Sequence, residues 1–198
     1  MLSSIHPLGE RSRGQRFPIT ATAYIVGSTA AGAGLGTLLG LIGAALTPSP
    51  VGDAAALIII GVVAALGLGH DLWPRHVRLP MPHRQVDEDW LVRYRGWVYG
   101  FGFGAQLGVG IATIITTGLV YLTWSAALLS GQAATGLIIG ATFGATRALV
   151  ILAVARVATP AQLHTAHRRL DRLRQGAGRA AVATLAVGLT ATALAALT

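Results

Sequence analysis

Five long apolar stretches dominate the chain, and short segments rich in arginine, histidine or proline separate them. An α-helix rises about 1.5 Å per residue, so about 20 apolar residues cross the roughly 30 Å hydrocarbon core of a bilayer. Each stretch is close to that length or longer. The pattern predicts an all-α, polytopic membrane helix bundle of about five transmembrane helices, with spans near 19–46, 51–69, 97–124, 133–157 and 179–197.

The composition agrees with this prediction. Of the 198 residues, 53% are hydrophobic and only 11% are charged, whereas about a quarter of a soluble domain is charged. We therefore expect one membrane domain over residues 1–198 and no separate soluble module. The first apolar stretch is far longer than the roughly 7 to 15 residues of a signal-peptide core, so we count it as a span. The chain has no cysteine, which excludes disulfides and thiol redox chemistry carried by the chain itself.

Arginines fall in every second connecting segment. They precede the first span and recur in residues 70–96 and 158–178, whereas residues 47–50 and 131–132 carry no charge. This is the positive-inside pattern, and it predicts a cytoplasmic N-terminus and a C-terminus outside. All fifteen basic residues are arginine, as is typical of GC-rich coding, so we expect the inner (cell) membrane of a bacterium. The net charge of +8 comes from arginines between the spans, which set the orientation of the chain in the membrane, so no nucleic-acid partner is expected.

The two Arg-rich segments, 70–96 and 158–178, are predicted to lie at the cytoplasmic membrane surface. Thr159-Pro160-Ala161-Gln162 has the order of an N-cap, a proline at the first helical position and a capping-box partner. The helix that follows has one apolar and one Arg-rich face, an arrangement suited to anionic lipid headgroups. The alternative is a solvated linker between spans.

Small residues mark one face of the first and fourth spans. Two sets share the spacing i, i+4, i+8, i+11: Gly32, Gly36, Gly40 and Gly43, and Gly136, Gly140, Gly144 and Arg147. Small residues spaced by four let helix backbones approach closely in lipid, so both faces are predicted to be buried against other helices. Arg147 would then point into protein.

A second likeness aligns residues 32–36 with residues 104–108. It suggests an internal repeat in which the first two spans recur, in parallel orientation, as the third and fourth. The alternative is that Gly-rich helices resemble each other by chance.

In its size, its paired Gly-rich spans and the segment Gly136 to Arg147, the chain resembles the small Gly-rich proteins of the cytochrome c biogenesis (CcdA/DsbD) and LysE-type transporter group. The resemblance covers around half of the chain and implies movement of something small across the membrane. The chain departs from this group in two ways. The redox members need paired membrane cysteines, which are absent here, and six spans are usual where we predict five.

Arg147 is the charge that lies in the middle of an apolar stretch. A charge at bilayer depth costs at least about 2.5 to 3.5 kcal/mol, so it usually faces protein or water and marks a functional site. We predict a substrate-binding site around it, formed by Arg147, Gln106, Thr113, Thr117, Thr142 and Thr146. In the structural alternative, Arg147 extends toward the cytoplasm, pairs with Asp71 or backbone carbonyls, and merely orients the fourth helix.

These features favour transport or export of a small solute, and the arginine favours an anionic one. The alternative is a non-transporting accessory or scaffold subunit of a larger complex. A transporter needs a polar cavity that reaches both sides in some state, whereas an accessory protein is packed solid and exposes an apolar groove. No nucleophile, base and orienting group come together in the sequence, so we expect no enzyme activity, metal site or cofactor. Homo-oligomers or other membrane subunits are the expected partners.

Overall fold

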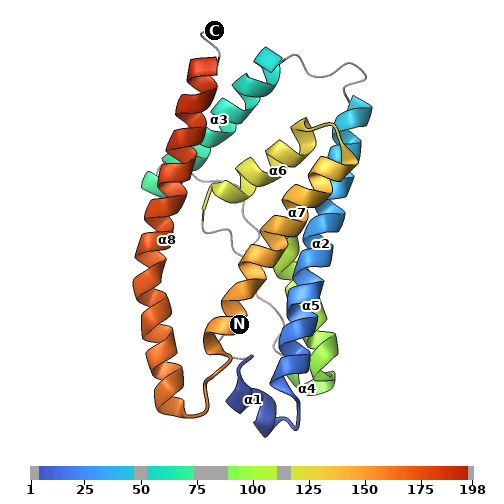
Figure 1. Cartoon of the computed structure of the whole chain (residues 1–198), viewed down its shortest axis with the longest axis vertical. Coiled ribbons are helices and arrows are strands. Elements are labelled where there is room, and N and C mark those ends of the chain that lie inside the picture. Colours follow the sequence, from blue (N-terminus) through green and yellow to red (C-terminus); the bar gives the residue numbers. More distant parts are fainter. Residues whose placement is uncertain (1–4, 47–52, 74–88, 111–116, 196–198) are drawn as a thin grey trace.

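The computed structural model describes residues 5–46, 53–73, 89–110 and 117–195. Its regular elements in these ranges are all helical (Figure 1). In chain order they are α1 (Pro7–Ser12), α2 (Phe17–Leu46), α3 (Asp53–Leu72), α4 (Trp90–Arg93), α5 (Gly96–Val109), α6 (Leu119–Leu129), α7 (Ala133–Ala148), the 3-10 helix η1 (Leu149–Val154) and α8 (Pro160–Ala195).

Four helical stretches in the described part of the chain are long and apolar enough to cross a membrane. They are α2, α3, the continuous stretch Ala133–Val154 made of α7 and η1, and α8. The predicted class, a polytopic all-helical membrane bundle, is thus confirmed. Three of the four stretches lie close to the spans predicted at 19–46, 51–69 and 133–157. The orientation and the internal repeat stay predictions.

The span predicted at 97–124 is wrong as a single helix. It is divided into α5, which ends at Val109, and α6, which begins at Leu119. Gly110 follows α5 with a φ of 73°, a left-handed conformation that glycine adopts without steric cost. The hydrophobic pattern does not indicate that the helix ends here, because the residues on both sides of Gly110 are still hydrophobic. Beyond the predicted end, α6 continues to Leu129, and a turn with Gly131 at a φ of 57° leads into α7.

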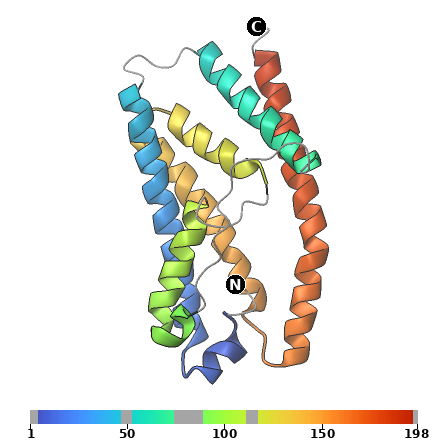
Figure 2. The same ribbon diagram turned by 180° about the vertical axis from the view of Figure 1, so that it is seen from behind.

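Helix α2 runs along one edge of the molecule and packs against both α7 and α5 (Figures 1 and 2). Between α2 and α7 the helices meet through their backbones. A Cβ atom added at Gly36 would overlap the carbonyl oxygen of Gly136, and one at Gly32 would overlap that of Gly140. The glycines of both predicted faces are buried, which confirms that these faces are packing surfaces.

The contact between α2 and α5 follows the same rule. A Cβ atom at Gly104 would overlap the carbonyl oxygen of Tyr24, and one at Gly108 would overlap that of Ser28. The buried Ser28 hydroxyl in turn donates a hydrogen bond of 2.7 Å to the carbonyl oxygen of Gly144 on α7. Three helices are therefore fixed to one another at backbone distance. We call α2, α5 and α7 the glycine framework.

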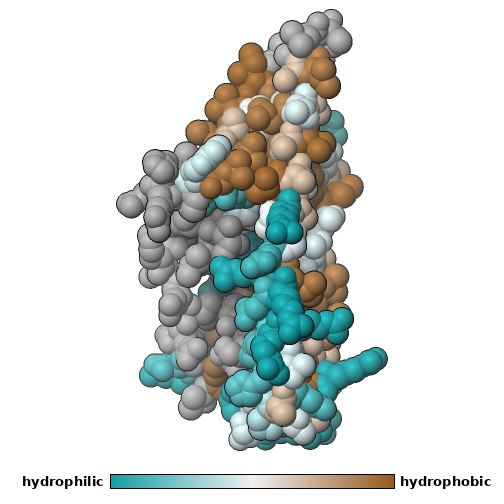
Figure 3. Space-filling view, turned by 90° about the vertical axis from the view of Figure 1, so that its left-hand side faces the viewer, coloured by the Kyte–Doolittle hydropathy of each residue, from teal (hydrophilic) through white to brown (hydrophobic). Residues whose placement is uncertain are grey.

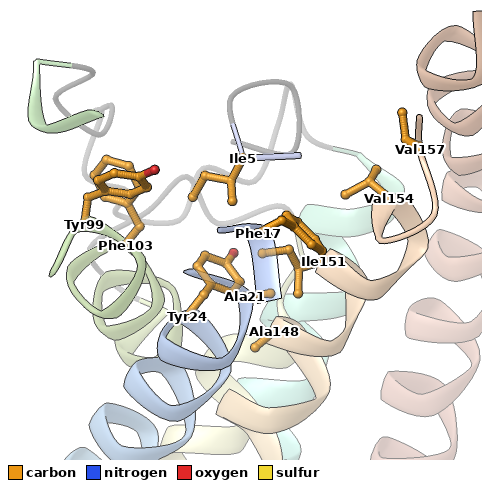
Figure 4. Packing of buried hydrophobic residues seen from close by; sticks show 10 residues of the cluster. All are labelled: Ile5, Phe17, Ala21, Tyr24, Tyr99, Phe103, Ala148, Ile151, Val154 and Val157. Carbon is orange, nitrogen blue, oxygen red and sulfur yellow. The ribbon is translucent and has the colours of Figure 1, made fainter. Parts of the chain in front are cut away.

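Buried side chains gather at one end of this framework, where the N-terminal segment packs (Figure 4). Phe17, Ala21 and Tyr24 come from α2 and Tyr99 and Phe103 from α5. The α7 and η1 side contributes Ala148, Ile151 and Val154. At this end, α2 and α5 remain in backbone contact, because a Cβ atom at Gly100 would lie 2.6 Å from the carbonyl oxygen of Thr20.

Helix α8 lies outside the framework and packs mainly along α3 (Figure 1). It begins as predicted: the Thr159 hydroxyl accepts from the Gln162 N–H at 3.3 Å, and Gln162 Oε1 accepts from the Thr159 N–H at 3.3 Å. One continuous helix runs through both the predicted surface segment, 158–178, and the predicted span, 179–197, so the division between them stays a prediction. Gly176 and Gly178 lie at the junction, where an isolated glycine weakens a helix without ending it.

The two halves of α8 differ in polarity. Residues 171–180 are all exposed, and hydrophilic side chains gather in the lower and middle part of the face shown in Figure 3, with hydrophobic ones above. The other predicted surface segment, 70–96, is only partly described. Residues 70–72 belong to α3, α4 follows near its end, and residues 74–88 lie outside the described ranges.

Candidate functional site

The break in the third span leaves two helix ends inside the molecule. Helix α5 ends at mid-height of the bundle close to α7, and α6 begins near the end of α3 (Figure 1). A helix end has unsatisfied backbone groups and a partial charge, positive at the N-terminus and negative at the C-terminus. Away from bulk water, such ends need partners. The side chains that face them are therefore the candidates for chemistry.

Arg147 of α7 lies beside the C-terminal end of α5. A Cβ atom at Gly110 would come within 2.9 Å of Arg147 Nη1 and of the Phe143 ring. The guanidinium also lies over that ring, 5.1 Å from its centroid. The negative end of the α5 dipole and the face of the aromatic ring both stabilise a cation. The close approach and the positive φ explain why a glycine occupies position 110.

Asp71 of α3 lies at the N-terminal end of α6. Its Oδ1 atom accepts from the Gly118 N–H at 2.9 Å, and its Oδ2 atom accepts from the Thr117 hydroxyl at 2.6 Å. The backbones also meet here, because a Cβ atom at Gly118 would overlap the Cα atom of Gly67. Asp71 thus caps α6, and its negative charge faces the positive end of the helix. This is the carboxylate that the structural alternative assigned to Arg147.

Arg147 is half-buried and lines an open groove with a volume of about 470 Å³. Thr142 and Thr146 line the same groove and are exposed, and Ile138 and Ile139 give it an apolar wall. The Thr146 hydroxyl donates to the carbonyl oxygen of Thr142 at 2.7 Å, within its own helix. The groove therefore combines one cation with a largely apolar lining. We call it the Arg147 groove.

Phe143 connects the groove to the outer half of the broken span. Its ring meets the buried Trp124 of α6 edge to face, with 5.0 Å between centroids. The guanidinium of Arg147 and the indole of Trp124 thus contact the same ring.

The structure brings some of the predicted site residues together and separates others. Thr142 and Thr146 lie with Arg147 in the groove, whereas Thr117 binds Asp71. Gln106 is half-buried on α5 and is not among the residues that line the groove. Thr113 lies outside the described residues. The substrate site as a whole stays a prediction.

A second polar cluster joins α1 to α2 and α5, and the sequence analysis missed it. Glu10 is fully buried. Its carboxylate accepts from Arg13 Nη2 at 2.7 Å, from the Thr20 hydroxyl at 2.5 Å and from the Tyr99 hydroxyl at 2.6 Å. Burial of the Arg13 guanidinium lowers its pKa, but the hydrogen bonds and charge interactions with Glu10 and Tyr99 together outweigh this effect, so the pKa lies above its ordinary value. The cluster closes one end of the framework.

One signal for this cluster exists in the sequence. Glu10 and Arg13 have the i, i+3 spacing at which opposite charges pair on a helix. Tyr99, however, is 89 residues away in the sequence, and no local pattern connects it with Glu10. Asp71 carries even less signal, because the site it caps exists only where the third span breaks.

Comparison with known proteins places this arrangement in a family. The model for the cytochrome c biogenesis protein transmembrane region matches residues 3–190, which is nearly the whole chain. The chain belongs to this family.

Curated relatives point in the same direction. The methylamine utilization protein MauF of Paracoccus versutus is 32% identical over 157 residues, covering 76% of this chain and 55% of that protein. MauF of Methylophilus methylotrophus is 31% identical over 159 residues, covering 76% and 53%. The chain therefore spans about half the length of the curated relatives it matches. No solved structure matches the chain.

Family membership confirms the cytochrome c biogenesis part of the predicted resemblance, and the LysE-type part finds no support. The protein is thus an integral, multi-pass membrane protein of this family. Because it contains no cysteine, it carries no dithiol relay of its own.

Proposed function

We propose that the protein is a non-transporting accessory subunit that supports the maturation of another protein in a bacterial inner membrane. The observation that carries this proposal is the Arg147 groove, which opens to the outside of a bundle whose centre is packed backbone to backbone. The family is named for cytochrome c biogenesis and the relatives for methylamine utilization, and neither name describes a solute carrier.

Packing in the glycine framework supports the proposal physically. A transporter holds its substrate in a hydrated site between helices that move against each other. Here the carbonyl oxygens of Gly136 and Gly140 occupy the space that any side chain on Gly36 or Gly32 would need. The interface between α2 and α7 is therefore too tight for a passage. The groove that remains lies at the edge of the framework.

The chemistry of the Arg147 groove indicates its partner. An arginine binds a carboxylate through two parallel N–H donors, can also donate to the single oxygen of an amide, and stays charged. Ile138 and Ile139 beside it offer apolar contact to a helix. We infer that the groove receives a transmembrane helix of another subunit, with an acidic or amide side chain directed at Arg147. A second copy of the chain is the alternative occupant.

Complementation of a strain that lacks the gene tests this function. The variants are Arg147→Leu and, as a matched control, Arg174→Leu, which removes an exposed arginine of α8 far from the groove in sequence. Two outputs are measured: covalently bound haem in the cytochromes c of the membrane, and growth on methylamine. We expect Arg147→Leu to reach wild-type levels in the membrane but to lose at least one output, and Arg174→Leu to retain both.

Three other outcomes count against parts of this proposal. If the deletion strain keeps both outputs, the accessory function is wrong. If Arg147→Leu is missing from the membrane, the arginine serves to hold α5 and α7 together. If both variants behave like the wild type, the groove is not the recognition surface.

Transport of a small anion is the second candidate function, and the broken third span favours it. Interrupted helices place partial charges at membrane depth, which is where carriers bind ions and substrates. Purified protein in sealed vesicles distinguishes the two functions. Uptake of labelled small carboxylates that requires Arg147 would support transport, whereas vesicles as tight as protein-free ones support the accessory function.

A further inference from the structure

A second groove lies where the chain turns from η1 into α8, at the C-terminal end of the α7–η1 stretch. Its volume is about 380 Å³. Arg156 approaches it from the turn and Arg169 from the third turn of α8, and both side chains are exposed. Ala153 and Val157 form part of its apolar lining. We call it the Arg156–Arg169 groove.

Two guanidinium groups around one hollow form a site for a phosphate. Each guanidinium carries a full charge at neutral pH and presents N–H donors in a plane that matches phosphate oxygens. Gln162 adds a polar group to the lining. Its Oε1 atom accepts from the Ala158 N–H at 2.7 Å, so the amide NH₂ group is directed away from the capping contact and remains a donor.

The position of the groove favours a lipid as the source of the phosphate. The apolar stretch Ala133–Val154 ends immediately before Arg156, so the groove lies where a membrane-crossing helix meets the headgroup layer. Leu149, Val150 and Leu152 precede the groove residue Ala153 in η1, and 44% to 51% of the surface of each is exposed. They form an apolar surface of the kind that acyl chains cover.

We propose that the Arg156–Arg169 groove binds the headgroup phosphate of an anionic phospholipid, whose acyl chains lie along the exposed face of η1. This binding is separate from the partner recognition proposed for the Arg147 groove. It fixes the junction between η1 and α8, the hinge through which the long Arg-rich helix joins the bundle. The other exposed arginines of α8 contribute a general attraction to a negative surface and no specific site.

Matched double variants separate the specific site from general attraction. Arg156→Gln with Arg169→Gln empties the groove of charge, and Arg172→Gln with Arg174→Gln removes the same charge from exposed positions of α8 that do not line it. Binding of phosphatidylglycerol to detergent-purified protein is measured by native mass spectrometry and by the shift in Tm. Phosphatidylcholine and inorganic phosphate serve as the comparison ligands.

We expect phosphatidylglycerol to raise the Tm of the wild type and of the control variant, and phosphatidylcholine and inorganic phosphate to have little effect. A direct hydrogen bond from an arginine to the phosphate contributes about 1 kcal/mol net, so loss of both groove arginines should weaken binding about thirtyfold. The control should weaken it only about threefold. Each single groove variant should bind phosphatidylglycerol about fivefold more weakly. These single variants test the proposal if the double variant does not fold.

Equal losses in the two double variants would overturn the proposal in favour of diffuse attraction. The same Tm shift with inorganic phosphate would show a site for free anions, and the same shift with phosphatidylcholine would show that acyl chains alone are bound. Both outcomes contradict a headgroup site.

Discussion

In the glycine framework, helices touch through backbone atoms, whereas α3 and α8 meet through side chains. A Cβ atom at Gly67 of α3 would lie 3.3 Å from Leu185 Cδ2, and one at Gly61 would lie 3.2 Å from Thr192 Oγ1. The helices also differ in how much of their apolar length is buried. In the most apolar 18 residues of each helix, 28% are buried in α2, against 17% in α3 and 11% in α8. The framework is rigid at backbone level, and the α3–α8 pair is attached to it by fewer and softer contacts.

This difference has a physical origin. Lipid tails are as apolar as leucine, so helices in a membrane gain little from hiding hydrophobic side chains and depend on close packing instead. The framework achieves that packing through glycine. The α3–α8 pair does not, and most of its surface stays available to lipid or to a partner. The broken span links the two regions, because α5 belongs to the framework and α6 is capped by Asp71 of α3.

The largest expected effect comes from filling the framework with a side chain. A Cβ atom at Gly36 would overlap the carbonyl oxygen of Gly136 and approach the Cα atom of Gly140 to 3.1 Å. Added methylene groups in a packed core cost typically about 1 to 3 kcal/mol, and a whole leucine against backbone exceeds this. We expect Gly36→Leu to abolish the folded protein, as measured by its yield and Tm in detergent.

Gly34 provides the control on the same helix. It is exposed, and no heavy atom lies within 4 Å of a Cβ atom placed there. Gly34→Leu should therefore keep the wild-type yield and Tm. Equal behaviour of the two variants would mean that α2 and α7 are not in backbone contact, and the contrast between the two regions would disappear.

Packing of this kind was predictable from the sequence, because small residues at every fourth position leave few other interpretations. The neighbours of Arg147 were predictable only within its own helix. Thr142 and Thr146 share its groove because helical spacing places them there. Thr117 lies elsewhere, because α5 ends at Val109 and Thr117 stands just before α6, where it binds Asp71.

Contacts between distant segments were beyond sequence reasoning for a different reason. Asp71 and Thr117 are 46 residues apart, and Glu10 and Tyr99 are 89 apart. Each pair consists of residues that are common at helix ends and membrane interfaces. Their meeting depends on how whole helices are placed, which no local pattern records.

The intermediate effect concerns the polar cluster that closes the framework. Replacing Glu10 with Gln keeps its size but removes the charge that Arg13 and Tyr99 bind. Loss of a buried, charge-assisted partner costs about 1 to 3 kcal/mol. We expect Glu10→Gln to lower the Tm and to expose α1 to limited proteolysis, with the rest of the framework intact.

Arg11→Gln is the matched control, because Arg11 is an exposed charge on the same short helix. It should change neither the Tm nor the proteolysis pattern. The double variant of Glu10→Gln with Tyr99→Phe should be less destabilised than the sum of the single variants, since both remove the same hydrogen bond. Simple additivity would show that Glu10 and Tyr99 act independently, and the cluster would then not be a unit.

The smallest effect is expected for a substitution of Gly178 in the Arg-rich half of α8, where this glycine has no close neighbour. No heavy atom lies within 4 Å of a Cβ atom at Gly178, so Gly178→Ala changes only the helix itself. Alanine is favoured over glycine inside a helix by roughly 0.5 to 1 kcal/mol. Hydrogen exchange of the α8 amides should therefore slow by a few-fold.

The same substitution at Gly144 should accelerate exchange in α7, because a Cβ atom there would overlap the carbonyl oxygen of Ser28. Effects of the same sign at both positions would show that packing does not distinguish the two regions.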